Sequence, residues 1–287
     1  MSSENQNLVP DLTTMLFVPA GRPRMIEKAR TLEADAVIID LEDGTGVGEK
    51  LDARAALPAQ LAAPWPDRPV LFVRVNGPST DYFVDDVTTA VECRPYGICV
   101  PKCETAEDVK RAEYYVERAG GGPEIRLLPF VESALGVIKA YEIASASQRV
   151  VAIALGSEDL AADVGLRRTK AGAEIAYYRG AIATAARAAD VLAIDAVFID
   201  FNDPDGLAAD SANGRAAGFA GKQLIHPSQI AVVQRAFAPT PEELTRAGRI
   251  LAAFEAAERE GTGVVVVDGQ MIDRPVVLQA RRTMSRK

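Results

Sequence analysis

The 287-residue chain contains a single histidine and only three cysteines, Cys93, Cys99 and Cys103. Structural zinc sites are built mainly from cysteine and histidine side chains, so this composition argues against a Cys/His zinc site. An odd number of cysteines also fits poorly with the disulfide framework of a secreted domain. We therefore expect reduced cysteines with a structural role.

Runs of basic residues and long apolar runs are also missing. Acidic residues outnumber basic ones by 40 to 32, giving a net charge of −8, which argues against an extended nucleic-acid surface. A local basic pocket for a phosphate ligand remains open. No apolar run approaches the roughly 20 residues that cross a bilayer, and the opening MSSENQNLVPDLTT lacks a basic segment followed by an apolar one. The expectation is a cytoplasmic protein without nucleic-acid or membrane partners.

Short β-rich runs alternate with segments whose apolar residues recur at intervals of three and four, as in amphipathic helices. The predicted strands are residues 15–20, 36–40, 70–76, 97–102, 125–132, 150–159, 196–201 and 222–227. Eight strand–helix repeats predict an α/β fold, a (β/α)8 TIM barrel. A doubly wound sheet gives the same alternation, but PAGRPRM after the first run lacks the spacing of a dinucleotide-binding turn.

The pattern divides the chain into a catalytic barrel, residues 1–237, and a C-terminal extension of helices and strand-like segments, residues 238–287. The extension is more than a barrel needs. It either caps its own barrel or covers the active site of a neighbouring subunit, and the residues alone leave both open.

Polar residues close the predicted strands. They are Asp40, Glu42, Asp43, Arg74, Asn76, Lys102, Glu132, Glu158, Asp159, Asp200, Asp203 and His226. Active sites of TIM barrels lie at the carboxyl ends of the strands, so these side chains are expected to converge on one mouth.

Glu132 and Asp159 are the best candidates for metal ligands, because Mg²⁺ keeps several waters and binds through few carboxylates. The alternative is that each acid caps a following helix, and for Glu158 we prefer that interpretation. Arg74 follows four apolar residues and offers a planar fork for a substrate carboxylate. Its alternative is an internal salt bridge to Asp40 or Asp43.

Eight segments in order resemble the citrate lyase β-subunit-like family of CoA-ester lyases, within the HpcH/HpaI aldolase/citrate lyase group. They are LFVPAGRPRMIEKA, DAVIIDLEDG, FVRVNG, CVPKCET, LLPFVESALGV, ALGSEDLAADVG, GFAGKQLIHPSQI and VVVVDGQMID. The resemblance covers nearly the whole chain. One departure is DLEDGTG where the family usually has DLEDAV, which puts the acyl specificity in doubt.

The resemblance implies roles for individual residues. Glu132 and Asp159 would bind Mg²⁺, and Arg74, together with Glu132, would hold the keto or hydroxy acid. Arg24 and Lys28 would meet the phosphates of coenzyme A. Asp273 of the MID motif would come from a neighbouring subunit as catalytic acid or base, in a homotrimer or hexamer.

The predicted activity is Mg²⁺-dependent cleavage or formation of a 3-hydroxyacyl-CoA, such as malyl-CoA or citramalyl-CoA, with a 2-keto acid and acetyl-CoA as the other partners. Two alternatives remain: a CoA-independent aldolase that joins pyruvate to an aldehyde, and a non-catalytic subunit. His226, the single histidine, is a candidate base, but we favour a role in shaping a loop or the wall of the CoA groove.

Overall fold

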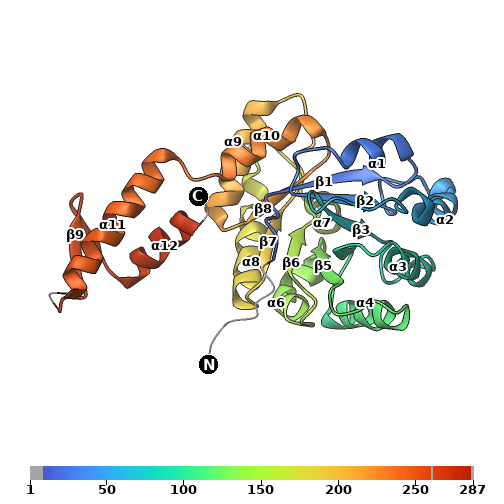
Figure 1. Cartoon of the computed structure of the whole chain (residues 1–287), viewed down its shortest axis with the longest axis horizontal. Helices are drawn as coiled ribbons and strands as arrows, with labels where there is room; N and C mark the ends of the chain where they lie inside the picture. Colours follow the sequence, from blue (N-terminus) through green and yellow to red (C-terminus); the bar gives the residue numbers. More distant parts are fainter. Residues whose placement is uncertain (1–8, 260, 286–287) are drawn as a thin grey trace. The chain divides into compact units, whose positions relative to one another are not determined.

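Eight parallel strands close into a barrel in the computed structural model, which describes residues 9–259 and 261–285. The predicted (β/α)8 TIM barrel is confirmed. The strands follow one another around the barrel in chain order, and β1 pairs with β8 to close it (Figure 1). The barrel strands are β1 (Thr14–Pro19), β2 (Ala36–Asp40), β3 (Val70–Arg74), β4 (Gly97–Val100), β5 (Arg126–Val131), β6 (Ala152–Leu155), β7 (Leu192–Asp195) and β8 (Gly221–Leu224).

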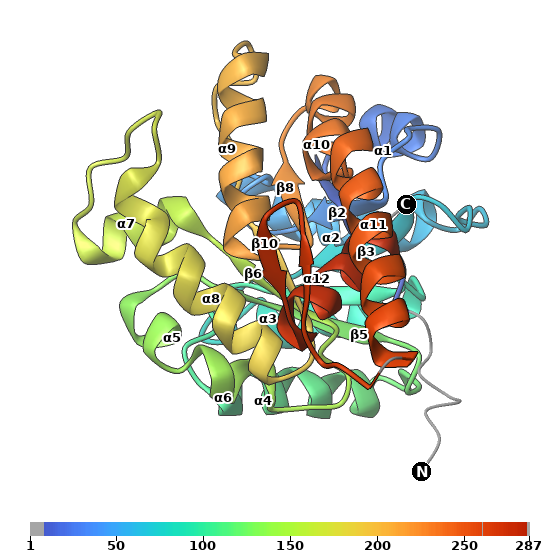
Figure 2. The same ribbon diagram turned by 90° about the vertical axis from the view of Figure 1, so that its left-hand side faces the viewer.

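Helices surround the barrel, as Figures 1 and 2 show from two directions. Those of the barrel region are α1 (Pro23–Ala29), α2 (Lys50–Gln60), α3 (Phe83–Glu92), α4 (Ala106–Arg118), α5 (Ala134–Ile138), α6 (Ala140–Ala144), α7 (Ser157–Val164), α8 (Ala176–Ala188), α9 (Pro204–Ala217) and α10 (Ile230–Phe237). Three 3-10 turns are η1 (Val47–Glu49), η2 (Ala173–Ile175) and η3 (Pro227–Gln229).

The barrel interior is filled by apolar side chains from opposite strands. Met15, Ile38, Phe72, Leu128 and Ile194 are fully buried there, as expected for a packed core rather than a pore. The three cysteines are free: Cys99 lies in this core, Cys103 is also buried, and Cys93 is half-buried at the end of α3.

The prediction for the seventh strand is wrong. The sequence VLAIDAVFID holds two apolar runs that each end in Ile-Asp, and we expected the second, residues 196–201. The structure places the first run in the barrel as β7, whose Leu192 pairs with Ala152 of β6. The reason is Asp195, which is fully buried and bound by Arg179 and Lys222.

The predicted sixth strand also ends early. β6 stops at Leu155, and Ser157 begins helix α7. Glu158 and Asp159 therefore lie in the first turn of a helix, where acidic side chains are favoured by the helix dipole.

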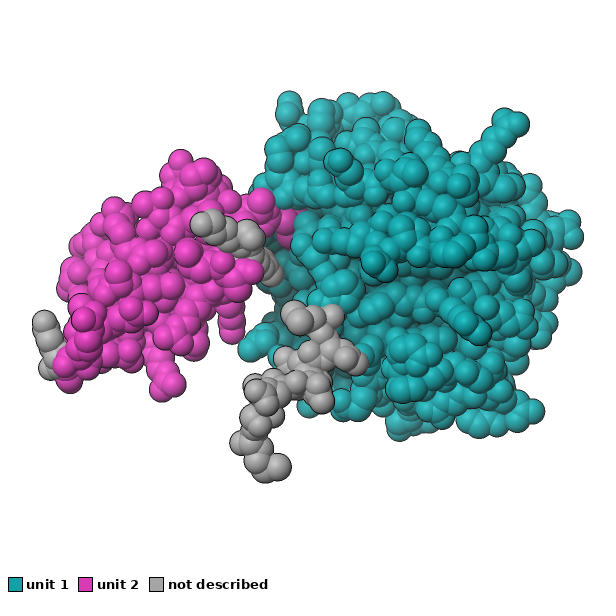
Figure 3. Space-filling model, in the orientation of Figure 1, with its two compact units in different colours: residues 1–236 teal, residues 237–287 magenta. Residues whose placement is uncertain are grey.

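The described chain divides into two compact units, Met1–Ala236 and Phe237–Lys287, coloured separately in Figure 3. The second unit contains α11 (Pro241–Arg259), the antiparallel pair β9 (Val265–Val267) and β10 (Gln270–Ile272), and α12 (Arg274–Ser285). It has an apolar core of its own, which includes Ile250, Phe254 and Val277. Within the described ranges, no helix has the length and apolar character to cross a membrane.

Candidate active site

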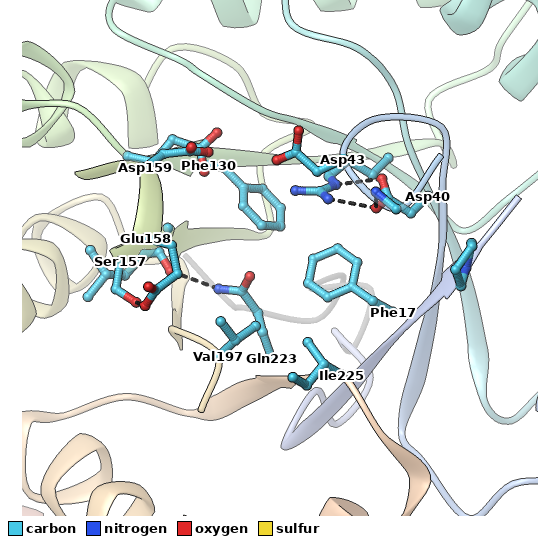
Figure 4. Close-up of a pocket in the computed structure, with 16 residues that line it drawn as sticks. Phe17, Asp40, Asp43, Phe130, Ser157, Glu158, Asp159, Val197, Gln223 and Ile225 are labelled. Atoms are coloured by element: carbon cyan, nitrogen blue, oxygen red, sulfur yellow. Dashed lines mark hydrogen bonds and ion pairs between the residues drawn. The ribbon is translucent and has the colours of Figure 1, made fainter. Parts of the chain in front are cut away.

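A cavity of about 360 Å³ lies at the carboxyl ends of the barrel strands (Figure 4). Its lining comes from six of the barrel strands, and from loops and a helix that follow barrel strands. The lining residues are Phe17, Pro19, Asp40, Asp43, Gly44, Arg74, Phe130, Glu132, Leu155, Gly156, Ser157, Glu158, Asp159, Val197, Gln223 and Ile225. The pocket thus brings together Arg74, Glu132 and Asp159, which the sequence singled out.

Arg74 is the last residue of β3 and is almost fully buried. Its Nε and Nη2 donate to Asp40 Oδ1 and Oδ2, both at 2.7 Å, and its Nη1 lies 3.0 Å from Glu42 Oε2. The salt bridge considered as the alternative for Arg74 is therefore present with Asp40. Burial acts to lower the pKa of Arg74, but Asp40 and Glu42 outweigh it and raise the pKa, so the guanidinium stays charged.

The pairing with Asp40 leaves Arg74 available to a ligand. Arginine has five N–H donors; Asp40 takes two of them and Glu42 one, which leaves one N–H on each terminal nitrogen. The group lies over the ring of Phe17 at 4.6 Å and near that of Phe130 at 5.7 Å, which fixes its plane within the pocket.

Hydrogen bonds from Lys50 hold the turn after β2 in place. Lys50 Nζ donates to the carbonyl oxygens of Leu41 and Glu42 and to Asn76 Oδ1. Asn76, expected at the mouth, instead belongs to this network through its bond to Asp86. The network orients the turn that carries Glu42, directly after Asp40.

Lys102, just after β4, links two acids of the site. Its backbone has a φ of +55°, a conformation that residues other than glycine rarely adopt. In this conformation its N–H donates to Glu132 Oε1 at 2.7 Å, while its Nζ donates to Glu42 Oε1 at 2.6 Å. Strained backbone of this kind is common at functional sites.

Glu132 is a buried carboxylate among other carboxylates. Burial raises its pKa to about 7, and the negative charges of Glu42 and Asp159 add to the effect of burial. Gly156 makes room for it, since a Cβ at that position would lie 2.1 Å from Glu132 Oε2. Glu132 is not the helix cap considered as its alternative, because Ser133 caps α5 by accepting the N–H of Gly136.

Glu158 and Asp159 share the first turn of α7 but differ in their contacts. Glu158 accepts from Ser157 Oγ and from Arg168 Nε, which agrees with a structural role at the helix start. Asp159 lines the pocket beside Glu132, and its negative charge acts on the pKa of Glu132.

The arrangement of Glu132 and Asp159 suits a hard divalent cation. In the described ranges, no group of three or more His, Cys, Asp or Glu side chains is placed to hold a metal ion, so an ion here would have two protein carboxylates. Mg²⁺ binds in this way and takes its other ligands from water and substrate. Both carboxylates also line an adjacent cavity, together with Lys102 and Ser133.

Other predicted site residues lie outside the pocket. Arg24 and Lys28 are exposed, one turn apart on α1. His226 caps the turn η3 through Ser228 and stacks on Phe201 at 5.0 Å, which agrees with a role in shaping a loop. Asp273 belongs to the second unit, where its carboxylate accepts the N–H of Val276 at the start of α12.

The prediction that Asp200 and Asp203 converge on the mouth is wrong. They follow the apolar run that was mistaken for the seventh strand, and both bind Lys170 at the surface. Asp203 also caps α9 by accepting the N–H of Gly206.

Sequence reasoning missed the pocket residues Phe17, Phe130 and Gln223. The two phenylalanines carried no signal, because they read as ordinary core residues. Gln223 did carry a signal, because it is a polar residue within the last barrel strand, between Lys222 and Leu224.

Comparisons with known proteins agree with this geometry. A sequence profile of the HpcH/HpaI aldolase/citrate lyase family matches residues 13–227. The citrate lyase subunit beta of Leuconostoc mesenteroides subsp. cremoris is 39% identical over 276 residues, 94% of this chain and 91% of that protein. A (3S)-malyl-CoA thioesterase of Cereibacter sphaeroides (strain ATCC 17025) is 37% identical over 273 residues, 95% of this chain and 93% of that one.

Solved structures give the same result. CitE from Mycobacterium tuberculosis, in complex with magnesium, acetoacetate and coenzyme A, superposes with a TM-score of 0.81 at 34% identity, covering 96% of this chain and 97% of that one. The M. tuberculosis citrate lyase beta subunit complexed with oxaloacetate and magnesium has a TM-score of 0.67 at 34% identity, covering 79% and 96%. The profile spans most of the chain and the relatives match almost all of it; the chain belongs to the HpcH/HpaI aldolase/citrate lyase family.

Proposed function

We propose that this protein is a Mg²⁺-dependent carbon–carbon lyase that cleaves or forms a 3-hydroxyacyl-CoA of the malyl-CoA or citramalyl-CoA type. The observation that carries the proposal is that Arg74, Glu132 and Asp159 line one pocket together. Relatives that act on CoA thioesters, and a related structure with magnesium and coenzyme A, support it.

Arg74 holds the carboxylate of the hydroxy acid. A guanidinium binds a carboxylate through two parallel N–H···O bonds, and Asp40 presents it in one orientation. The rings of Phe17 and Phe130 lie close to the guanidinium, and apolar neighbours lower the local dielectric constant, which strengthens the interaction.

Glu132 and Asp159 would hold Mg²⁺, and the ion, when bound, supplies Lewis-acid stabilisation to the substrate oxygen that gains negative charge. Its binding also compensates the repulsion among the carboxylates, because a cation keeps Glu132 ionised where burial favours protonation.

Cleavage breaks the bond between C2 and C3 of the thioester. The hydroxyl at C3 gives its proton to water and becomes the 2-keto group, while the electron pair of the broken C2–C3 bond passes to the enolate of acetyl-CoA. A proton added at C2 completes acetyl-CoA. We assign this proton to Asp273 of a neighbouring subunit, and Arg24 and Lys28 to the phosphates of coenzyme A, by resemblance to the family.

The test is an assay of acetyl-CoA and 2-keto acid release from a panel of 3-hydroxyacyl-CoA thioesters, with and without EDTA. We expect release that requires Mg²⁺, and Glu132→Gln is expected to abolish it while leaving the circular dichroism spectrum unchanged. Activity in EDTA, or in Glu132→Gln, would contradict the proposal.

Hydrolysis of a malyl thioester is a second candidate, because several relatives are named (3S)-malyl-CoA thioesterases. The same assay separates the two reactions: hydrolysis releases the free thiol of coenzyme A, whereas cleavage leaves it acylated. A CoA-independent aldolase would instead be unaffected by Arg24→Ala, and a non-catalytic subunit would bind keto acid without turnover.

A further inference from the structure

Gln223 is a buried polar side chain in the pocket that has no part in the chemistry proposed above. It lies in β8, and only 3% of its surface is exposed. Its Nε2 donates to the carbonyl oxygen of Leu155 at 2.9 Å and to that of Asp195 at 3.1 Å. A primary amide has two N–H donors, so these bonds use both.

The two carbonyl partners fix which way the amide group of Gln223 faces. Carbonyl oxygens only accept hydrogen bonds, so the nitrogen must face Leu155 and Asp195, and the oxygen must face away from them. No residue in the described ranges donates to Gln223 Oε1. Figure 4 shows this oxygen on the side of the rings of Phe17 and Phe130, directed into the cavity.

Gln223 belongs to a distinct part of the lining, the β6–β8 wall, which we define as Leu155, Val197, Gln223 and Ile225. Three of these side chains are apolar, and the fourth presents an acceptor. Arg74 ends β3, four strands away from β7 in the closed barrel, and therefore lies on the opposite side of the pocket. A hydroxy acid whose carboxylate is held by Arg74 turns its other substituent toward the β6–β8 wall.

We infer that Gln223 is a specificity-determining residue that restricts the 2-keto acid product to one with a single carboxylate. A methyl group or hydrogen fits the apolar side chains of the wall, and a hydroxyl can donate to Gln223 Oε1. A second carboxylate directed at the wall would meet the acceptor Gln223 Oε1 and three apolar side chains, which is costly for a buried charge. The inference rests on the proposed function, because it assumes that a keto acid occupies this pocket with its carboxylate at Arg74.

The test is calorimetric binding of pyruvate, freshly prepared oxaloacetate and the 4-methyl ester of oxaloacetate to the Mg²⁺-saturated protein. The ester has nearly the size of oxaloacetate but lacks the second charge. We expect oxaloacetate to bind at least about tenfold more weakly than pyruvate, and the ester to recover most of the difference. Oxaloacetate binding as tight as pyruvate binding would overturn the inference.

A substitution tests Gln223 itself. In Gln223→Lys, the ammonium has three N–H donors, so it can satisfy both carbonyl oxygens and turn the third toward the cavity. This variant is expected to reverse the preference in favour of oxaloacetate. The matched control is Gln234→Lys, at a glutamine of α10 outside the pocket, which should keep the wild-type ratio. An unchanged ratio in a Gln223→Lys protein that still binds pyruvate would exclude the role, and the wild-type ratios decide the matter if the variant does not fold.

The proposed function fails separately from this inference. If no thioester is cleaved, the protein is not the proposed lyase, whatever the binding ratios are. If thioesters are cleaved but oxaloacetate binds as well as pyruvate, only the assignment of Gln223 is wrong.

Discussion

Arg74 combines two contacts that sequence reasoning treated as alternatives. It forms the buried salt bridge with Asp40 and it also lines the pocket. A buried carboxylate partner is one way to hold an arginine in a single orientation, because the fork geometry of the pair is directional. The charged residues of this site were predictable because a charged side chain at the end of an apolar strand is costly to bury without a partner or a ligand.

Arg74→Lys should weaken keto acid binding while retaining the positive charge. A lysine ammonium cannot make the paired bonds of a guanidinium, and losing charge-assisted hydrogen bonds of this kind lowers affinity by about tenfold to a hundredfold. Calorimetry with pyruvate and Mg²⁺ measures the change. Arg111→Lys is the matched control, since Arg111 packs on Phe83 outside the pocket, and it should leave the affinity unchanged. Equal losses in both variants would argue against a specific role of Arg74.

Glu132 gives a pH dependence of stability in the metal-free protein. Its pKa in the folded state is about 7, above the ordinary glutamate value of 4.5, so the folded protein holds a proton that the unfolded chain releases. The free energy of unfolding therefore falls as the pH rises from about 4.5 to about 7. The decrease is roughly 3 kcal/mol when the pKa shift is converted at about 1.36 kcal/mol per pH unit.

This dependence is measured by thermal unfolding in EDTA between pH 5 and 8. Glu132→Gln cannot ionise, so it should gain stability over the wild type as the pH rises, with the difference levelling off above pH 7. Adding Mg²⁺ should stabilise the wild type and not the variant. A constant difference between the two proteins across this range would contradict the raised pKa.

Gln223 marks the limit of prediction from single residues. Its type and place in an apolar run are visible in the sequence, but its hydrogen bonds reach Leu155 and Asp195, 68 and 28 residues away. Which end of the amide faces the pocket depends on those distant carbonyl groups. Only the assembled barrel therefore reveals Gln223 as an acceptor.

The order of the strands and helices was predictable because short apolar runs alternate regularly with amphipathic segments. The position of β7 was predicted wrongly because two adjacent apolar runs, VLAID and AVFID, have the same pattern. The choice between them depends on a buried cluster of Arg179, Asp195, Asp210 and Lys222, drawn from α8, β7, α9 and β8. Each charge in this cluster has partners of opposite sign. The desolvation cost of burying Asp195 is therefore offset only when all four elements are in place.

Lys222→Met should test what holds β7 in register. The change leaves Asp195 and Asp210 with Arg179 as their remaining cation, and removing one partner from a buried ion-pair cluster costs about 3–5 kcal/mol. Urea unfolding, followed by circular dichroism, measures the loss. The control is Lys170→Met, which breaks exposed pairs with Asp200 and Asp203 and should leave the unfolding midpoint unchanged. Similar midpoints for both variants would show that the buried cluster does not stabilise the strand.

For the whole molecule, the question is how the second unit takes part in the reaction. The sequence predicted a boundary at residues 237 and 238, and the structure divides the chain between Ala236 and Phe237. Among the residues that the structure describes, the lining of this pocket includes Arg74, Glu132 and Asp159 and ends at Ile225. An acid or base supplied by Asp273 must then come to the pocket from the second unit, of the same chain or of another.

Subunit mixing separates these two cases. Glu132→Gln removes a proposed metal ligand and Asp273→Asn removes the proposed proton donor, so each variant alone should be inactive. If Asp273 acts on a neighbouring subunit, co-assembly of the two variants in equal amounts creates sites with both residues intact, and random mixing gives about a quarter of the wild-type activity. If Asp273 serves its own chain, every site lacks one residue and the mixture stays inactive. Denaturing and refolding the variants together, with each refolded separately as the control, shows whether activity returns only through co-assembly.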